Sequence, residues 1–154
     1  MISAEAGSLW VLDTNVVLDL LHFDDAAARP LLGALENGRV HAAVTDATLE
    51  ELRRVLAYPE FALDPASQAA LLARYQSLSM REEAVSVDTV PRCSDPDDQK
   101  FLELAAASRA QLLVSKDRAL LKLRRRCASL FQVLTPAEAV HWLHGISRAS
   151  ATET

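Results

Sequence analysis

The chain has 154 residues, 50% hydrophobic and 24% charged, which predicts one globular domain with a sizeable core. Aromatic residues make up only 5% of the chain, and this argues against a base-stacking surface of the RRM or OB type. The formal net charge of −5 argues against nucleic-acid binding, unless bound cations cancel some of the acidic residues.

The sequence also predicts where the domain lies and in which compartment. We expect a single domain over residues 1–146, followed by a small, polar and disordered tail over 147–154. No apolar run approaches the roughly 20 residues that span a membrane, so we expect a cytoplasmic protein with no membrane segment. Cys93 and Cys127 lack the spacing of a zinc site and are expected to be free thiols.

Strands and helices alternate from the start of the chain. The first half predicts a strand, two helices, a strand and two helices, at residues 9–12, 15–21, 26–36, 40–44, 47–57 and 65–78. The strands are short apolar runs, and the helices show apolar residues at helical spacing. Asp24-Asp25 can cap the second helix and Asn37-Gly38 can end it, while Thr45-Asp46 caps the third helix and Asp64-Pro65 starts the fourth.

The second half continues the alternation. It predicts a weak strand, a helix, a strand, a short helix, a strand and a last helix, at residues 84–87, 97–109, 111–115, 118–126, 130–134 and from 136 onward. Thr135 and Glu138 resemble a capping box that opens the last helix. Regular alternation of this kind predicts an α/β fold with a mostly parallel sheet covered on both faces.

Acidic residues lie at or just beyond the ends of several predicted elements. Asp13 follows the first strand, Asp117 follows the strand at 111–115, and the cluster Asp95-Pro96-Asp97-Asp98 opens a helix. The carboxyl ends of parallel strands meet at one edge of a sheet, so these side chains are expected to converge there. Converging carboxylates repel one another unless a positive charge lies between them, which points to a hard divalent cation.

Each acid alone has a structural explanation. Asp13 and Asp117 could each be a helix N-cap, and acids at the start of the helix after Asp95 could favour the positive end of its dipole. An exposed glutamate on the helix at 47–57 could pair with a neighbouring arginine. It is the combination of four acidic points that favours a site.

Two ambiguities concern which acid faces that site. Glu50 and Glu51 are adjacent on a helix and point about 100° apart, so only one of them is expected to face it. Asp98 shares a helical face with Leu102 and is the first choice in its cluster. Asp95 lies on the preceding loop, could reach the same space, and is the second choice.

With these residues in place, the chain resembles a PIN domain, in particular the VapC-type toxins of bacterial toxin–antitoxin pairs. The similar stretches are residues 11–17, 48–56, 58–61, 95–105, 113–121 and 134–138. Together they extend the resemblance over about residues 8–143, and their order and spacing are more specific than any one of them.

The resemblance implies a three-layer α/β/α sandwich and cleavage of single-stranded RNA that depends on Mg²⁺ or Mn²⁺. The family's catalytic acids correspond to Asp13, Glu51, Asp98 and Asp117, and its metal ligands to Asp13, Asp98 and Asp117, with Asp95 as a further candidate. Gln99 stands where relatives often have another aspartate, so a site that relies on that acid would be weakened.

The resemblance also indicates contacts and partners. Asn15, Ser115, Lys116 and Arg118 are expected to contact the substrate, with the basic residues holding RNA phosphates. A small cognate antitoxin protein is the implied partner, and homodimers are common in the family.

Two other interpretations remain open. A PIN-like module could bind RNA or a protein without cutting, although the retained acids argue against this. A haloacid-dehalogenase-like phosphatase also has an aspartate after its first strand, but it requires a second aspartate two residues later, where this chain has Asn15.

Overall fold

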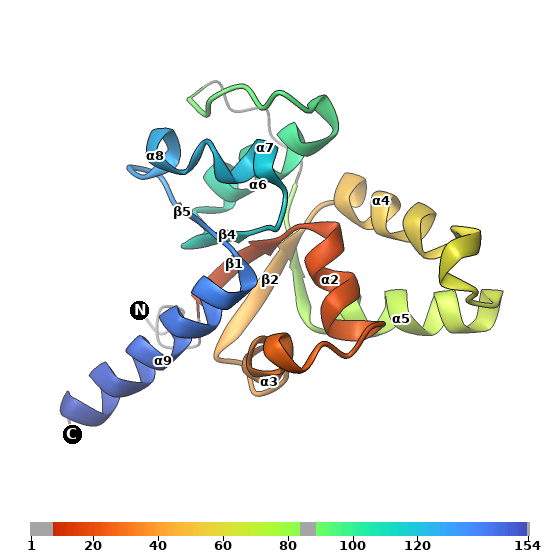
Figure 1. Cartoon of the computed structure of the whole chain (residues 1–154), viewed down its shortest axis with the longest axis horizontal. Helices are drawn as coiled ribbons and strands as arrows, with labels where there is room; N and C mark the ends of the chain where they lie inside the picture. Colours follow the sequence, from red (N-terminus) through yellow and green to blue (C-terminus); the bar gives the residue numbers. More distant parts are fainter. Residues whose placement is uncertain (1–7, 84–88, 154) are drawn as a thin grey trace.

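A five-stranded parallel sheet forms the centre of the molecule (Figure 1). The structure is a computed structural model that describes residues 8–83 and 89–153. Its strands are β1 (Ser8–Leu12), β2 (Val40–Val44), β3 (Ser79–Arg81), β4 (Leu112–Val114) and β5 (Gln132–Leu134). They are arranged in the order β3-β2-β1-β4-β5, with every neighbouring pair parallel. The chain thus moves outward from β1 in one direction and later in the other, which places a topological switch point between β1 and β4.

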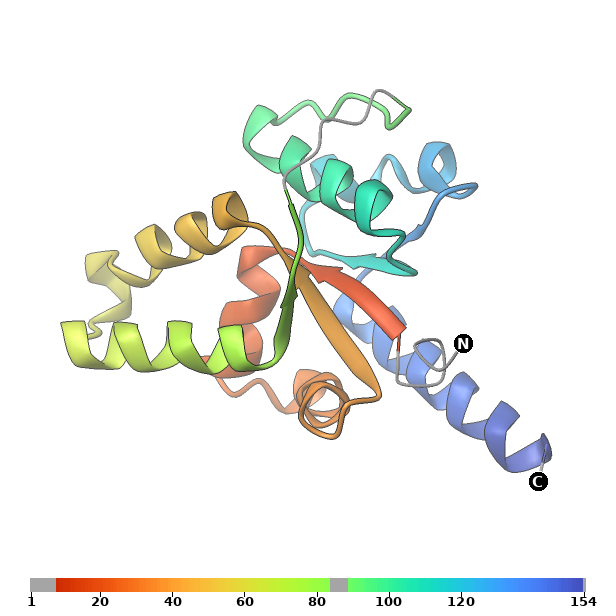
Figure 2. The ribbon, with the colours of Figure 1, turned by 180° about the vertical axis from the view of Figure 1, so that it is seen from behind.

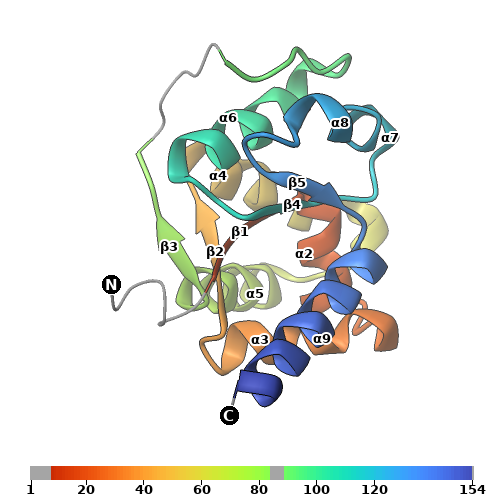
Figure 3. The same ribbon diagram turned by 90° about the vertical axis from the view of Figure 1, so that its left-hand side faces the viewer.

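Helices cover both faces of this sheet, which confirms the predicted three-layer α/β/α arrangement (Figure 3). The α-helices are α2 (Thr14–Leu21), α3 (Arg29–Glu36), α4 (Asp46–Leu56), α5 (Pro65–Ser77), α6 (Gln99–Ser108), α7 (Arg118–Leu121), α8 (Arg124–Cys127) and α9 (Pro136–Glu153). Short 3₁₀ turns are η1 (Ala26–Ala28), η2 (Pro59–Phe61) and η3 (Pro96–Asp98). Residues of α2, α3, α4, α5 and α9 pack on one face, and residues of α6, α7 and α8 pack on the other.

Side chains alternate along each central strand between two hydrophobic cores. Trp10 and Leu12 of β1 point into the core beneath α2, α3 and α9, whereas Val11 points into the core beneath α6. Leu112 and Leu113 of β4 divide between the two cores in the same way. Because both faces of the central strands are buried, their sequences are continuously apolar rather than alternating.

The third strand differs from the prediction. The strand expected at 84–87 lies outside the described residues, whereas β3 forms earlier, at Ser79–Arg81. Its residues show no apolar pattern, and Met80 is exposed. β3 forms because the backbone of Ala42–Val44 offers a free edge to pair with, in parallel register. A strand that depends on an edge carries little signal in its own sequence.

Several predicted helices also differ in extent, and the one expected at 97–109 begins with the 3₁₀ turn η3. The helix expected at 26–36 begins with the 3₁₀ turn η1, and the helix expected at 118–126 is divided into α7 and α8. The division follows from a tight turn in which the Leu123 N–H donates to the carbonyl of Leu120 at 3.0 Å, and both of these leucines are buried. α9 continues to Glu153, through the range where composition predicts a disordered tail, and the domain boundary at 146 stays a prediction.

No helix in the described ranges is both long and apolar enough to cross a membrane.

α4 and α5 form an arm that extends away from the sheet, joined at its tip by η2 (Figure 2). A capping box starts α4, as Thr45 suggested: its hydroxyl oxygen accepts from the Thr48 N–H at 3.2 Å, and the Thr48 hydroxyl oxygen accepts from the Thr45 N–H at 2.9 Å. These bonds satisfy two backbone donors at the start of the helix. They therefore fix the direction of α4, which carries side chains toward the carboxyl ends of β1 and β2.

Candidate functional site

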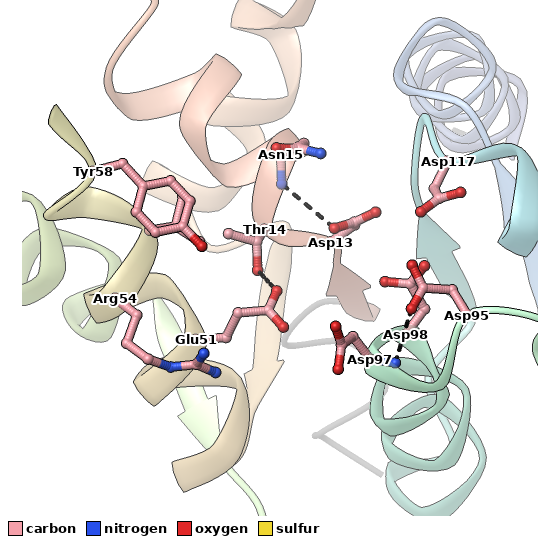
Figure 4. Close-up of a pocket in the computed structure, with 11 residues that line it drawn as sticks. Asp13, Thr14, Asn15, Glu51, Arg54, Tyr58, Asp95, Asp97, Asp98 and Asp117 are labelled. Atoms are coloured by element: carbon pink, nitrogen blue, oxygen red, sulfur yellow. Dashed lines mark hydrogen bonds between the residues drawn. The ribbon is translucent and has the colours of Figure 1, made fainter. Parts of the chain in front are cut away.

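A pocket of about 290 Å³ opens at the carboxyl edge of the sheet, beside the switch point between β1 and β4 (Figure 4). Its described lining residues are Asp13, Thr14, Asn15, Glu51, Arg54, Val55, Tyr58, Asp95, Asp97, Asp98 and Asp117. Acids from the ends of β1 and β4, from α4 and from η3 therefore share one cavity, as the positions of the strand ends predicted.

Asp13 lies at the base of this pocket and is 5% exposed. It is the N-cap of α2, where its Oδ1 accepts from the Asn15 N–H at 3.4 Å. Its Oδ2 accepts from the Ser115 hydroxyl at 2.7 Å. Burial raises the pKa of Asp13, these two hydrogen bonds oppose the rise, and the charges of Asp117 and Glu51 add to it. Asp13 thus caps a helix and also contributes charge to the pocket.

Ser115 links Asp13 to Asp117 from behind. Its Oγ donates to Asp13 and accepts from the Asp117 N–H at 2.9 Å. Asp117 in turn is the N-cap of α7, and its Oδ1 accepts from the Ala119 N–H at 2.8 Å. Ser115 is fully buried and is not among the described lining residues, and its contact with substrate stays a prediction.

Asp95, Asp98 and Asp117 form the tightest acidic cluster among the described residues. Each offers one carboxylate oxygen, and the three oxygens lie within 4.8 Å of one another. The 3₁₀ turn η3 brings Asp95 and Asp98 together, because Asp95 caps it with an oxygen that accepts from the Asp97 N–H at 3.0 Å. Both candidates for the third acid therefore reach the same space.

Asp98 is 8% exposed, and within the described part of the chain its Oδ2 is buried without a hydrogen-bond partner. Two ionised carboxylates have no proton to share, so a bond between Asp98 and Asp117 exists only when one of them is protonated. Burial is the largest cause that raises the pKa of Asp98. The hydrogen bond with Asp117 and the charges of Asp117, Asp13 and Asp95 raise this pKa further, to about 8. The site therefore holds more negative charge than its surroundings stabilise.

Glu51 faces this cluster from the opposite wall of the pocket (Figure 4). Its Oε2 accepts from the Thr14 hydroxyl at 2.5 Å, and its Oε1 forms an ion pair with Lys100. Glu50 points elsewhere and pairs with Arg53, whose Nε lies 2.9 Å from Glu50 Oε1. Only one of the two adjacent glutamates thus faces the site, as their angular separation predicted.

Of the other residues predicted to contact substrate, one lines the pocket and two lie outside its described lining. Asn15 is exposed and lines the pocket. Lys116 forms an ion pair with Asp19, with 2.6 Å between Nζ and Oδ2, and Arg118 is exposed outside the lining. Their contacts with substrate stay predictions.

Thr14, Arg54 and Tyr58 also line the pocket, although none of them was among the predicted site residues. Thr14 directly follows Asp13 and lies within the stretch 11–17 that resembles a PIN domain. Arg54 and Tyr58 follow Glu51 by three and seven residues, which is the spacing of one helical face, and this was the available signal.

Gln99 lies beside the acidic cluster but outside the pocket lining. Its Oε1 accepts from the Cys93 N–H at 2.7 Å and its Nε2 donates to the Pro91 carbonyl at 3.2 Å. The side chain therefore connects the loop before η3 to the start of α6.

Cys93 and Cys127 are both free and buried.

The donor set fits Mg²⁺ or Mn²⁺. These cations prefer carboxylate oxygens and keep part of their water shell, which requires an open site rather than a closed cage. The described pocket offers clustered carboxylate oxygens, one of them buried without a partner, in a cavity that is open to solvent. A bound cation would relieve the repulsion that raises the pKa of Asp98.

Comparison with known proteins places this geometry in a family. A family model described as PIN domain matches residues 10–119. The fold is similar to that of VapBC2 from Rickettsia felis, solved bound to a DNA fragment from their promoter, with a TM-score of 0.58 and 14% sequence identity over 82% of this chain and 98% of that chain. A search of curated protein sequences found no match. Because the family model spans well over half of the sequence, the chain belongs to the PIN domain family.

Proposed function

We propose that the chain is an endoribonuclease that cleaves single-stranded RNA with the help of Mg²⁺ or Mn²⁺. The observation that carries this proposal is the meeting of Asp13, Asp95, Asp98 and Asp117 in one pocket, opposite Glu51. Membership of the PIN domain family supports nuclease chemistry. The pocket is open to solvent, and a flexible single strand could bring its exposed phosphates up to the acids.

Each acid has a distinct task in this proposal. Asp95, Asp98 and Asp117 would hold the cation, and Asp13 would complete the set from the base of the pocket. When bound, the cation supplies a water of lowered pKa and stabilises negative charge on the scissile phosphate. Glu51, fixed by Thr14 and Lys100, orients the attacking water from the facing wall. The described lining includes no histidine, serine or cysteine, and the proposal requires none of them, because water is its nucleophile.

Cleavage should depend on an added cation. We expect a fluorescently labelled single-stranded RNA to be cut in Mg²⁺ or Mn²⁺, to remain intact in EDTA, and to be cut again when excess cation is restored. Cleavage that survives EDTA would contradict the proposal. Hydrolysis of small phosphomonoesters alone would favour the phosphatase, and metal binding without cleavage would favour a binding module.

Ser115 should act as a positioning residue for the two acids it links. Ser115→Ala removes the hydroxyl that donates to Asp13 and accepts from the Asp117 N–H, and we expect about 10- to 100-fold weaker Mn²⁺ binding, measured by calorimetry. Ser115→Thr keeps the hydroxyl and should retain much of the affinity. Equal affinities of Ser115→Ala and the unmodified chain would show that this hydroxyl does not orient the ligands.

The similarity to the Rickettsia felis VapBC2 complex supports a toxin role with a small antitoxin as partner. Expression of the chain in a bacterium should then arrest growth, and co-expression of the product of a neighbouring short reading frame should relieve the arrest and co-purify with it. Growth that is unaffected by an active nuclease would contradict the toxin role but leave the cleavage activity standing. Cytoplasmic location and homodimerisation stay predictions.

A further inference from the structure

Arg54 is the one basic side chain among the described residues that line the acidic pocket. It lies on α4, on the same wall as Glu51 (Figure 4). Its neighbour Arg53 is held by Glu50 on another side of the helix, whereas within the described part of the chain no carboxylate forms an ion pair with Arg54. Glu50 attracts Arg54 electrostatically, but no described carboxylate lies within ion-pair distance of it, so its guanidinium donors stay available for an anion.

Tyr58 lines the same wall and is 45% exposed. Its backbone N–H donates to the Val55 carbonyl at 3.0 Å, which fixes it just beyond the end of α4. The Phe61 ring lies beside it, with the ring planes 6° from parallel and the centroids 6.4 Å apart. Phe61 in turn contacts Phe23 and packs against the hydrophobic core. The Tyr58 ring is thus exposed to solvent, while Phe61 and the backbone hydrogen bond hold it in place.

The 5% aromatic content argued against a base-stacking surface, but folding places Phe23, from a separate segment, beside Phe61, whose ring lies next to that of Tyr58. Only Tyr58 of these three lines the pocket. Every nucleobase has a π-face, so a ring of this kind stacks bases without strong sequence preference. A guanidinium beside it is suited to the phosphate of the same strand.

We propose that Arg54 and Tyr58 form the subsite that holds single-stranded RNA next to the cleavage point, with Arg54 binding a flanking phosphate and Tyr58 stacking a base. This inference rests on the proposed nuclease function and deepens it. The strand crosses the wall formed by α4 and η2, and its scissile phosphate faces the aspartates on the other side. The substrate is thereby held by α4 rather than by the predicted Lys116, which Asp19 already pairs.

Arg54→Gln and Arg53→Gln provide a matched test, because they make the same change on adjacent residues of one helix. We expect Arg54→Gln to raise KM for a labelled single-stranded RNA by about tenfold, since a charged hydrogen bond to phosphate is lost, with little change in kcat. The plot of log(kcat/KM) against log[KCl] should become shallower by about 0.7, the value for one lost phosphate contact on a single strand. Arg53→Gln should change neither quantity.

Tyr58→Leu and Tyr58→Phe separate stacking from packing and from the hydroxyl. Tyr58→Leu should raise KM by about tenfold through lost stacking, while Tyr58→Phe keeps the ring and should stay close to the unmodified chain. Melting curves check that each variant is folded. If the unmodified chain cleaves RNA but Arg54→Gln matches Arg53→Gln, or Tyr58→Leu matches Tyr58→Phe, the subsite is overturned while the proposed function stands.

If the unmodified chain does not cleave RNA, the proposed function fails and the same variants are compared by fluorescence anisotropy with the labelled strand. Weaker binding by Arg54→Gln and Tyr58→Leu alone then supports the subsite. Equal binding by all four variants rejects the subsite. That result is also expected if the wall of α4 and η2 binds a protein partner instead of RNA.

Discussion

Replacing Asp117 with asparagine should lower the rate of RNA cleavage by about 100-fold or more, because loss of a supporting partner alone costs about 10- to 100-fold and Asp117 is itself a proposed ligand. The fold should remain intact. Asp117 caps α7 by accepting from the Ala119 N–H, and asparagine is an equally good cap with an oxygen in the same place. The variant therefore removes a charge and keeps a hydrogen bond. Initial rates in saturating Mg²⁺, together with circular dichroism spectra, measure both effects.

Asp64→Asn is the matched control for this change. Asp64 caps α5 by accepting from the Ser67 N–H at 2.7 Å and does not line the pocket. Asp64→Asn removes the same charge from another helix N-cap, so the cleavage rate of this variant should equal that of the unmodified chain. A normal rate for Asp117→Asn would remove this residue from the metal site.

Replacing Asp98 with asparagine should abolish cleavage and yet stabilise the metal-free protein at alkaline pH. The pKa of Asp98 is raised to about 8 from its ordinary value of 3.8, first by burial and then by its carboxylate neighbours. An asparagine amide can donate to Asp117 as protonated Asp98 does, but it has no charge to lose. A gain of about 1 kcal/mol in unfolding free energy would raise Tm by about 2–4 °C.

The same shift predicts how stability depends on pH. Between about pH 4 and pH 8 the folded protein holds a proton on Asp98 that the unfolded chain has released. The free energy of unfolding therefore falls as pH rises through this window and levels off above about pH 8. Thermal melts in EDTA from pH 6 to pH 8.5 should show a falling Tm for the unmodified chain and a flatter profile for Asp98→Asn.

Cation and control variants complete this experiment. Added Mg²⁺ at pH 8.5 should raise the Tm of the unmodified chain, because it binds only the folded state, and should raise that of Asp98→Asn much less. The Ser67 N–H lowers the pKa of Asp64, so this residue is ionised throughout the range and Asp64→Asn should follow the unmodified chain. A Tm for the unmodified chain that rises from pH 6 to pH 8.5 in EDTA would contradict the raised pKa of Asp98.

Much of the fold could be predicted from the sequence because its signals are local. β2 begins and ends where the apolar run 40–44 does, and the cap at Thr45 and the capping box at Thr135 start α4 and α9 as expected. A capping residue and its partner lie three residues apart, so the sequence itself contains both halves of the interaction. β3 was missed because its partner, β2, lies some 40 positions away and only the backbone edge recruits it.

The candidate site shows the same difference between local signals and contacts between residues distant in the sequence. Acids after strand ends predicted a shared edge, and Asp13, Glu51, Asp98 and Asp117 do line one pocket. The sequence did not reveal that Ser115 lies behind two of them. Its hydroxyl meets Asp13, 102 positions earlier, only because β1 and β4 are neighbours in the sheet.

By itself, the sequence determined the alternation of strands and helices and the caps that start the helices, because periodicity and capping act over a few residues. It also determined the gathering of acids at one edge of the sheet. The tertiary structure decided that Asp95 and Asp98 both join Asp117, that Glu51 rather than Glu50 faces them, and that Arg54 and Tyr58 form the opposite wall. Those choices depend on how α4 and η3 pack against the sheet. Contacts between such distant segments are set by the burial of whole helix faces, which no local pattern specifies.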